Sequence, residues 1–151
     1  MIIIDDKFWM AEALKAAEQA YRQGEVPVGA ILVEGDREVA RTYNLRETLQ
    51  DPTAHAEILA LREGARVRGH WRLTGMCLYV TLEPCPMCAG ALVNARVDRV
   101  VFGAYDPKAG AASSVLNVLG EVRLNHRPQV VGGILQEECG EILRRFFAER
   151  R

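Results

Sequence analysis

The chain has 151 residues, of which 49% are hydrophobic and 26% charged, as in an ordinary soluble globular domain. Its apolar runs are far shorter than the roughly 20 residues that cross a bilayer, which excludes a membrane-spanning helix. The N-terminus becomes acidic at Asp5-Asp6, which argues against a secretory signal. The net charge of −1 gives no support for a broadly basic surface. We therefore expect one domain over residues 1–151, located in the cytoplasm and without membrane contact.

The first half of the chain predicts a helix, a β-hairpin and a second helix. Apolar residues recur at three- and four-residue steps over residues 5–23, which indicates an amphipathic helix. Residues 28–33 and 37–43 favour two strands, and Gly35-Asp36 between them suits a two-residue turn. Asp51-Pro52 combines a capping side chain with a proline, so we expect the second helix to start there and to end near Arg68.

The second half predicts three strands and two helices. The strands are expected at residues 76–82, 97–104 and 130–134, and the helices from Pro86 to Ala95 and from Gln136 onwards. An irregular stretch rich in small residues, 106–114, follows the strand at 97–104. This order implies one mixed sheet with helices on both faces, in which the hairpin supplies two strands and helical crossovers supply the parallel ones. The predicted fold is therefore a three-layer α/β/α arrangement around a five-stranded sheet.

Four cysteines occur in the chain: Cys77, Cys85, Cys88 and Cys139. A disulfide framework is not expected in a chain of this size without a secretory signal. Cys77 and Cys139 lie in apolar runs, which favours the role of small buried hydrophobes. Cys85 and Cys88 form a C-x-x-C pair, which is typical of metal ligands or of a redox dithiol.

Two short motifs suggest metal chemistry. His55-Ala56-Glu57 and Pro84-Cys85-Pro86-Met87-Cys88 both lie at predicted helix starts, where backbone N–H groups favour thiolates. One imidazole and two thiolates form a zinc set that leaves the fourth position for water. Zinc lowers the pKa of bound water towards ~7, and Glu57 could shuttle protons from the resulting hydroxide to a substrate. The motifs thus predict hydrolytic deamination.

Two other interpretations of these residues stay open from the sequence. A closed structural site would recruit Cys77 or Cys139 as a fourth ligand and would leave Glu57 exposed. A thioredoxin-like dithiol would use Cys85 and Cys88 but would leave His55 and Glu57 unexplained.

The combination of H-x-E with P-C-x-x-C is the signature of zinc-dependent nucleobase deaminases. Over nearly its whole length, the chain resembles the bacterial tRNA-specific adenosine deaminases of the cytidine deaminase superfamily. The most specific blocks are Asp51–Ile58 and Thr81–Ala91. The resemblance implies a cytidine-deaminase-like fold and a homodimer with one zinc ion per subunit. It also implies conversion of the wobble adenosine to inosine in the anticodon loop of an arginine tRNA.

The resemblance further implies roles for single residues. His55, Cys85 and Cys88 would bind zinc, and Glu57 would shuttle protons. Residues that would contact the substrate are Asn44 at the flipped-out base, Val28 as an apolar wall of its pocket, and Asp106 and Lys108 near the anticodon loop. From the residues alone, Asn44 and Asp106-Pro107 would be ordinary turn residues and Val28 part of the core. Ser113 departs from the family, which has glycine at this position.

The C-terminal segment, residues 143–151, carries four arginines against one glutamate. It is either a solvated basic helix end or an RNA contact, with Arg150 as the candidate residue. Two other functions compete with tRNA deamination. One is a deaminase of free guanine, cytosine or a nucleoside, and the other is a non-catalytic RNA-binding module with structural zinc.

Overall fold

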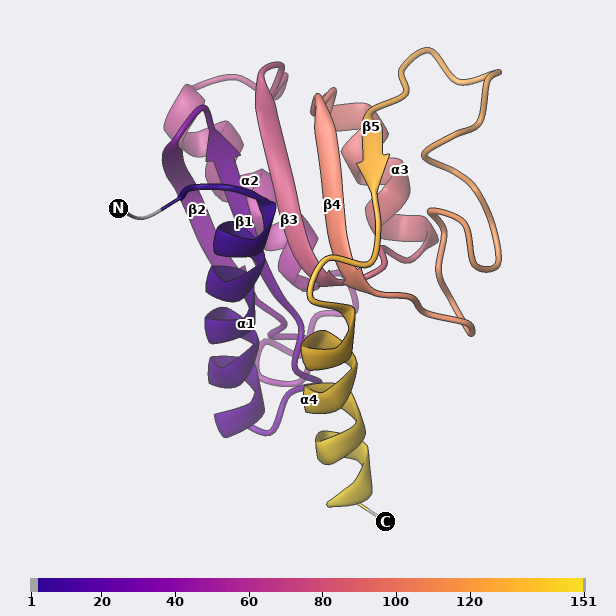
Figure 1. Ribbon diagram of the computed structural model, residues 1–151. Helices are drawn as coiled ribbons and strands as arrows, with labels where there is room; N and C mark the ends of the chain where they lie inside the picture. The colour runs from indigo at the N-terminus through magenta and orange to yellow at the C-terminus, as the bar shows by residue number, and fades with distance from the viewer. Residues whose placement is uncertain (1–2, 151) are drawn as a thin grey trace.

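The computed structural model describes residues 3–150 and confirms the expected three layers around a mixed five-stranded sheet. The elements are α1 (Asp6–Arg22), β1 (Gly29–Glu34), β2 (Arg37–Tyr43), α2 (Ala56–Arg68), β3 (Met76–Leu82), α3 (Pro86–Ala95), β4 (Arg99–Ala104), β5 (Gln129–Val131) and α4 (Gln136–Ala148). In Figure 1, α1 and α4 cover one face of the sheet and α2 and α3 cover the other. Within residues 3–150, no helix is long and apolar enough to span a membrane.

The strands are ordered β2-β1-β3-β4-β5 in the sheet. β1 pairs antiparallel with both β2 and β3, whereas β3, β4 and β5 run parallel. The hairpin forms at the predicted turn, where Glu34 pairs with Arg37 and Gly35 has a φ of 63°. Such a positive φ is favourable only for glycine and a few polar residues, which explains why the turn lies there.

Each face of the sheet buries its own core because successive strand residues point to opposite sides. On β1, Leu32 packs towards α2 and α3, while Ile31 packs towards α1 and α4. On β4, Phe102 and Val101 divide in the same way. All four side chains are at most 1% exposed. The sheet is therefore a rigid support for the loops at its ends.

The predicted start of the second helix is wrong. α2 begins at Ala56, and His55 is its N-cap residue in an extended conformation. Asp51 instead accepts hydrogen bonds from the amide and hydroxyl of Thr53, at 2.8 and 2.7 Å, so its side chain closes a turn before the helix. This later start places Glu57 in the first turn of α2.

Turns and irregular backbone connect β4 and β5, as expected from the irregular stretch after the fourth predicted strand, whereas the bounds of both strands differ from the prediction. β4 begins at Arg99, two residues later than expected, and β5 is shorter than predicted, ending at Val131. Two glycines follow β5. A Cβ at Gly132 would overlap the ring of Phe102, and Gly133 has a φ of 88°. The backbone can therefore pass close to Phe102 and turn from β5 into α4.

Candidate active site

The site lies where α2 and α3 begin, at the end of β3. His55 and Cys85 are the N-cap residues of these helices, and both have extended backbone, with ψ of 153° and 173°. Neither side chain caps its own helix, so both are free to face each other. Pro86 takes the first helical position of α3, where its missing N–H costs no hydrogen bond. Cys88 follows one turn into α3 and is fully buried.

The three donor atoms form a compact group. Nδ1 of His55 lies 3.6 Å from Sγ of Cys85 and 3.5 Å from Sγ of Cys88. In a tetrahedral zinc site, Zn–S bonds near 2.3 Å and Zn–N bonds near 2.0–2.1 Å set an S and an N ligand about 3.5–3.6 Å apart. The donor types and their spacing therefore fit a zinc ion. Within the part of the chain that the structure describes, neither Cys77 nor Cys139 joins this group.

The remaining two cysteines have structural positions. Cys139 is fully buried on α4, against Gly103 of β4, where any side chain larger than hydrogen would overlap its sulfur. Cys77 is half-buried on β3, and Nη1 of Arg99 lies 3.9 Å from its sulfur. Burial raises the pKa of both thiols. A closed site with either cysteine as fourth ligand is therefore not supported.

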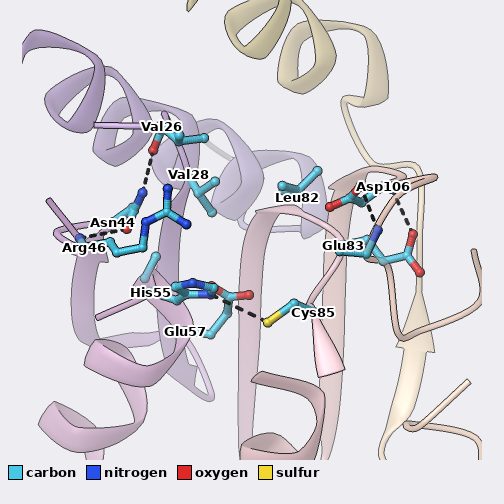
Figure 2. A pocket seen from close by; sticks show the side chains of 12 residues that line it. Val26, Val28, Asn44, Arg46, His55, Glu57, Leu82, Glu83, Cys85 and Asp106 are labelled. Carbon is cyan, nitrogen blue, oxygen red and sulfur yellow. Dashed lines mark hydrogen bonds between the residues drawn. The ribbon is translucent and has the colours of Figure 1, made fainter. Parts of the chain in front are cut away.

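The electrostatics of the group favour a thiolate. The hydrogen bond from Cys88, with that from His55, lowers the pKa of the Cys85 thiol despite burial. The same contact with Cys85 raises the pKa of His55. Glu57 is 4% exposed and points towards these side chains from the first turn of α2 (Figure 2). Burial raises the pKa of its carboxyl group.

His55, Glu57 and Cys85 form one end of a cavity of about 180 Å³. Figure 2 shows one wall on the β1 and β2 side and another on the β3 and β4 side. The lining residues are Val26, Val28, Asn44, Arg46, His55, Ala56, Glu57, Leu82, Glu83, Cys85, Asp106 and Ala109. A mostly apolar cavity with a few convergent polar groups is the usual form of a small-molecule site.

The structure places three of the five predicted substrate-contact residues at this cavity: Val28, Asn44 and Asp106. Asn44 is also a turn residue, as its local chemistry suggested. Its side-chain amide donates to the carbonyl of Val26 at 3.2 Å and accepts from the amide of Arg46 at 3.0 Å.

Lys108 and Arg150 are not among the lining residues. Lys108 is exposed, and its backbone amide donates to Asp106. The guanidinium of Arg150 lies 3.6 Å from the ring centroid of Phe146 and 3.9 Å from the carboxylate of Glu149. Arg151, the last residue of the basic segment, lies outside the described residues.

Sequence reasoning missed two buried carboxylates that support the walls. Glu83 is 2% exposed and accepts backbone hydrogen bonds of 2.9–3.0 Å from Asp106, Ala112, Ser113 and Ser114. Ser113 contributes through its backbone N–H while its side chain is exposed, so the departure from glycine leaves this anchor intact. Glu25, 1% exposed, anchors the opposite loop. No local pattern could reveal either, because their partners lie more than 20 residues away.

The pocket also contains Arg46, which the sequence analysis did not select. Its side chain is 48% exposed, and its Nε lies 3.7 Å from a carboxylate oxygen of Glu47. Its position was the one indication in the sequence that it could lie at the cavity, because Arg46 follows Asn44 by two residues in the same turn.

Comparison with known proteins agrees with this geometry. The family model of the MafB19-like deaminases matches residues 4–151. A tRNA-specific adenosine deaminase of Bacillus subtilis is 54% identical, over 97% of this chain and 91% of its own. One from Haemophilus influenzae is 47% identical, over 97% of this chain and 85% of its own.

Solved structures give the same result for the fold. A structure from a study of A-to-I editing by tRNA:A34 deaminases superposes with a TM-score of 0.87 and 44% identity, covering 90% of this chain and 99% of the other. A guanine deaminase from Nitrosomonas europaea has a TM-score of 0.86 at 21% identity, covering 98% of this chain and 87% of the other, and so shares the fold. The extent of the sequence matches shows that the chain is a deaminase and belongs to the bacterial tRNA-specific adenosine deaminase family of the cytidine deaminase superfamily.

Proposed function

We propose that this protein converts the wobble adenosine of an arginine tRNA to inosine by hydrolysis, as a homodimer with one zinc ion per subunit. The observation that carries the proposal is the cavity lined at one end by His55, Cys85 and a buried Glu57, with Cys88 in the same donor group as His55 and Cys85. The names of the relatives, tRNA-specific adenosine deaminases at up to 54% identity, support the substrate class.

His55, Cys85 and Cys88 would hold the zinc ion, because their donor atoms have the spacing of a tetrahedral site. When bound by three protein ligands, zinc keeps a position for water and lowers the pKa of that water towards ~7. Glu57 completes the site as a carboxylate that does not belong to the metal-ligand group among the described residues. The two functions, holding the metal and moving protons, thus fall on different side chains.

Glu57 would move protons in both halves of the reaction. As the water oxygen bonds to C6 of adenine, the carboxylate takes a proton from it and delivers this proton to N1. Glu57 then takes the second water proton from the new hydroxyl and passes it to the amino nitrogen on C6. The C6–N bond breaks, ammonia leaves, and the base retains a C6 carbonyl and an N1 proton, so that the nucleoside is now inosine. One water is consumed and no redox partner is required.

The walls of the cavity suit a single purine. Val28 and Leu82 offer apolar surfaces to the ring faces. Asn44 uses one of its two N–H donors and one acceptor position on backbone groups, which leaves one donor and one acceptor for the edge of the base. Since the cavity admits one base and no duplex, the target nucleotide must be unpaired or flipped out.

An anticodon loop presents such nucleotides on a shaped phosphate backbone. Arg46 at the cavity would contact a phosphate close to the target, and Lys108 and Arg150 would contact the loop farther out. The net charge of −1 argues for few, local phosphate contacts. A tRNA substrate would place the reaction in the cytoplasm.

An apolar groove between α2 and α3 supports the homodimer. Its volume is about 330 Å³, and Trp71 at its border is 54% exposed. Exposed apolar surface of this kind favours contact with another protein surface. The groove residues include Ile58, Leu61, Ala91 and Ala95.

The decisive experiment is to incubate the zinc-loaded protein with arginine tRNA that carries an ACG anticodon and to sequence the product for inosine at the wobble position. Ammonia release from free adenosine, guanine and cytosine is measured in parallel. Inosine in the tRNA with little release from free bases supports the proposal. Turnover of a free base without turnover of tRNA would instead establish a small-molecule deaminase. Binding of tRNA without any turnover would indicate an RNA-binding module.

A further inference from the structure

Glu25 is a buried carboxylate that the proposed reaction does not use. It lies between α1 and β1, is 1% exposed, and its backbone amide donates to the carbonyl of Ala20 at 3.0 Å. Its carboxylate oxygens face the loop that follows β2. A carboxylate is costly to bury unless its oxygens are hydrogen-bonded, so the partners of Glu25 indicate what the residue does.

The partners all belong to one helical turn. The Leu49 amide donates to the Leu45 carbonyl at 2.9 Å, which closes the turn. Oε1 of Glu25 accepts from the amide of Glu47 at 3.1 Å, and Oε2 accepts from the amide and the hydroxyl of Thr48, both at 2.6 Å. Glu25 therefore caps the first amides of this turn from a distant segment, as an N-cap side chain does within a helix.

The same turn orients the two cavity residues that follow β2. Oδ1 of Asn44 accepts from the amide of Arg46, so Asn44 and Glu25 together cap three successive amides. The Asn44 amide group also donates to Val26, the residue after Glu25. Segment 25–26 and loop 44–48 are thus joined by four hydrogen bonds. The Asn44 amide group is held on both sides, by the carbonyl of Val26 and the amide of Arg46.

We propose that Glu25 is a positioning residue for the substrate, which sets Asn44 and Arg46 against the base and its phosphate by capping the turn that contains Arg46, Glu47 and Thr48. This inference rests on the proposed function for the identity of the substrate. Only a carboxylate fills the role, because both oxygens accept from N–H or O–H donors. A glutamine has an NH₂ group in place of one of these two oxygens. That group would face a backbone N–H of the loop, which would lose its hydrogen-bond acceptor.

The test compares Glu25→Gln with the unmodified protein on a short anticodon stem-loop. Zinc content and circular dichroism should be unchanged, KM should rise about tenfold, and kcat should change much less. Glu63→Gln is the matched control, since Glu63 lies on α2, is ion-paired with Arg66 and does not line the cavity. Thr48→Val should raise KM by a smaller factor, and Thr48→Ser, which keeps the hydroxyl, should restore it.

A double-mutant cycle separates positioning from general loss of stability. If Glu25 acts through Asn44 and Arg46, Glu25→Gln should raise KM much less in an Asn44→Ala, Arg46→Gln background than in the unmodified protein. Equal effects in both backgrounds would overturn the inference. If Glu25→Gln does not fold, Thr48→Val in the same cycle decides the question, because it removes only one of the three hydrogen bonds.

Hydrogen exchange tests the local structure without substrate. The amides of Glu47 and Thr48 should exchange faster in Glu25→Gln, whereas those of β3 should not change. Unchanged protection at both loop amides would refute the inference whatever the substrate. If the unmodified protein fails to deaminate the stem-loop, the proposed function is wrong, and this exchange experiment still decides whether Glu25 holds the turn.

Discussion

Nδ1 of His55 lies 3.6 Å from Sγ of Cys85, although the two residues are 30 positions apart in the chain. Each is the N-cap residue of a helix, and the two helices pack on the same face of the sheet. Their N-termini therefore bring one imidazole and two sulfurs together without any continuous motif. Zinc binding by these three side chains is therefore the first property to test.

We expect one zinc ion per chain, and Cys85→Ala or Cys88→Ala should abolish stoichiometric zinc and lower the melting temperature, because metal binding contributes folding energy. Metal analysis and thermal unfolding measure both effects. Cys77→Ala is the control and should retain one zinc ion, since Cys77 lies outside the ligand group. Loss of zinc in this control, or full zinc in Cys88→Ala, would contradict the assignment.

Glu57→Gln should keep the zinc ion while kcat falls by roughly 10²–10⁴, the usual contribution of a general acid–base group. The amide keeps the shape of the side chain but cannot take up a proton. Single-turnover kinetics on the anticodon stem-loop and metal analysis of the same sample measure the two properties. A variant that lost zinc would show that Glu57 is a ligand, and a variant with full activity would exclude a proton shuttle. Glu63→Gln, on the same helix and ion-paired with Arg66, should behave as the unmodified protein.

Gly110→Ala should lower the free energy of unfolding by about 1–3 kcal/mol, because a Cβ at this position would overlap the carboxylate of Glu83. The change should also raise KM, since Glu83 anchors the loop with Asp106. Gly90→Ala is the matched control. Gly90 lies in α3 with nothing within 4 Å of the added carbon. The free energy of unfolding of this variant should therefore rise by about 0.5–1 kcal/mol, because alanine has a higher helix propensity than glycine. Chemical denaturation of both variants checks the pair, and equal effects would refute the overlap.

The acid limb of the stability curve should depend on Glu25. Burial alone would raise its pKa, but hydrogen bonds from the hydroxyl and amide of Thr48 and the amide of Glu47 outweigh burial and lower the pKa below the ordinary value of 4.5. The stabilisation is therefore complete above pH 4.5 and is lost as the pH falls through the depressed pKa of the folded state. Urea unfolding between pH 7 and pH 3 should show a shallower acid limb for Glu25→Gln. If the stability curves of the two proteins were parallel, the pKa of the Glu25 carboxyl group would not be lowered in the folded state.

Arg46→Gln should weaken binding of the stem-loop and reduce the salt dependence of the binding constant by about one unit of slope, as expected for one phosphate contact. Arg150→Ala should act in the same direction, more strongly at low salt than at high salt. Fluorescence anisotropy over a range of salt concentrations measures both. Arg66→Gln is the control, because Arg66 lies in the last turn of α2, far from the helix start that forms the site. An unchanged slope for Arg46→Gln would exclude a phosphate contact.

Local patterns alone determined most of the elements and the chemical identity of the site. The apolar steps of residues 76–82 and the proline at 86 predicted β3 and α3 at their observed bounds, because strand alternation and helix starts depend on near neighbours. The spacing of Cys85 and Cys88, with the H-x-E motif, indicated the donor set before any distance was known.

Only the tertiary structure decided the start of α2 and the anchors of the cavity. Asp51 has the residue pattern of a helix start, yet its side chain closes a turn with Thr53, and the packing of α2 on the sheet places the true start at Ala56. Glu25 and Glu83 appear in the sequence as ordinary charged residues. Their burial results from hydrogen bonds to loops more than 20 residues away, and such long-range partners leave no periodic signal in the chain.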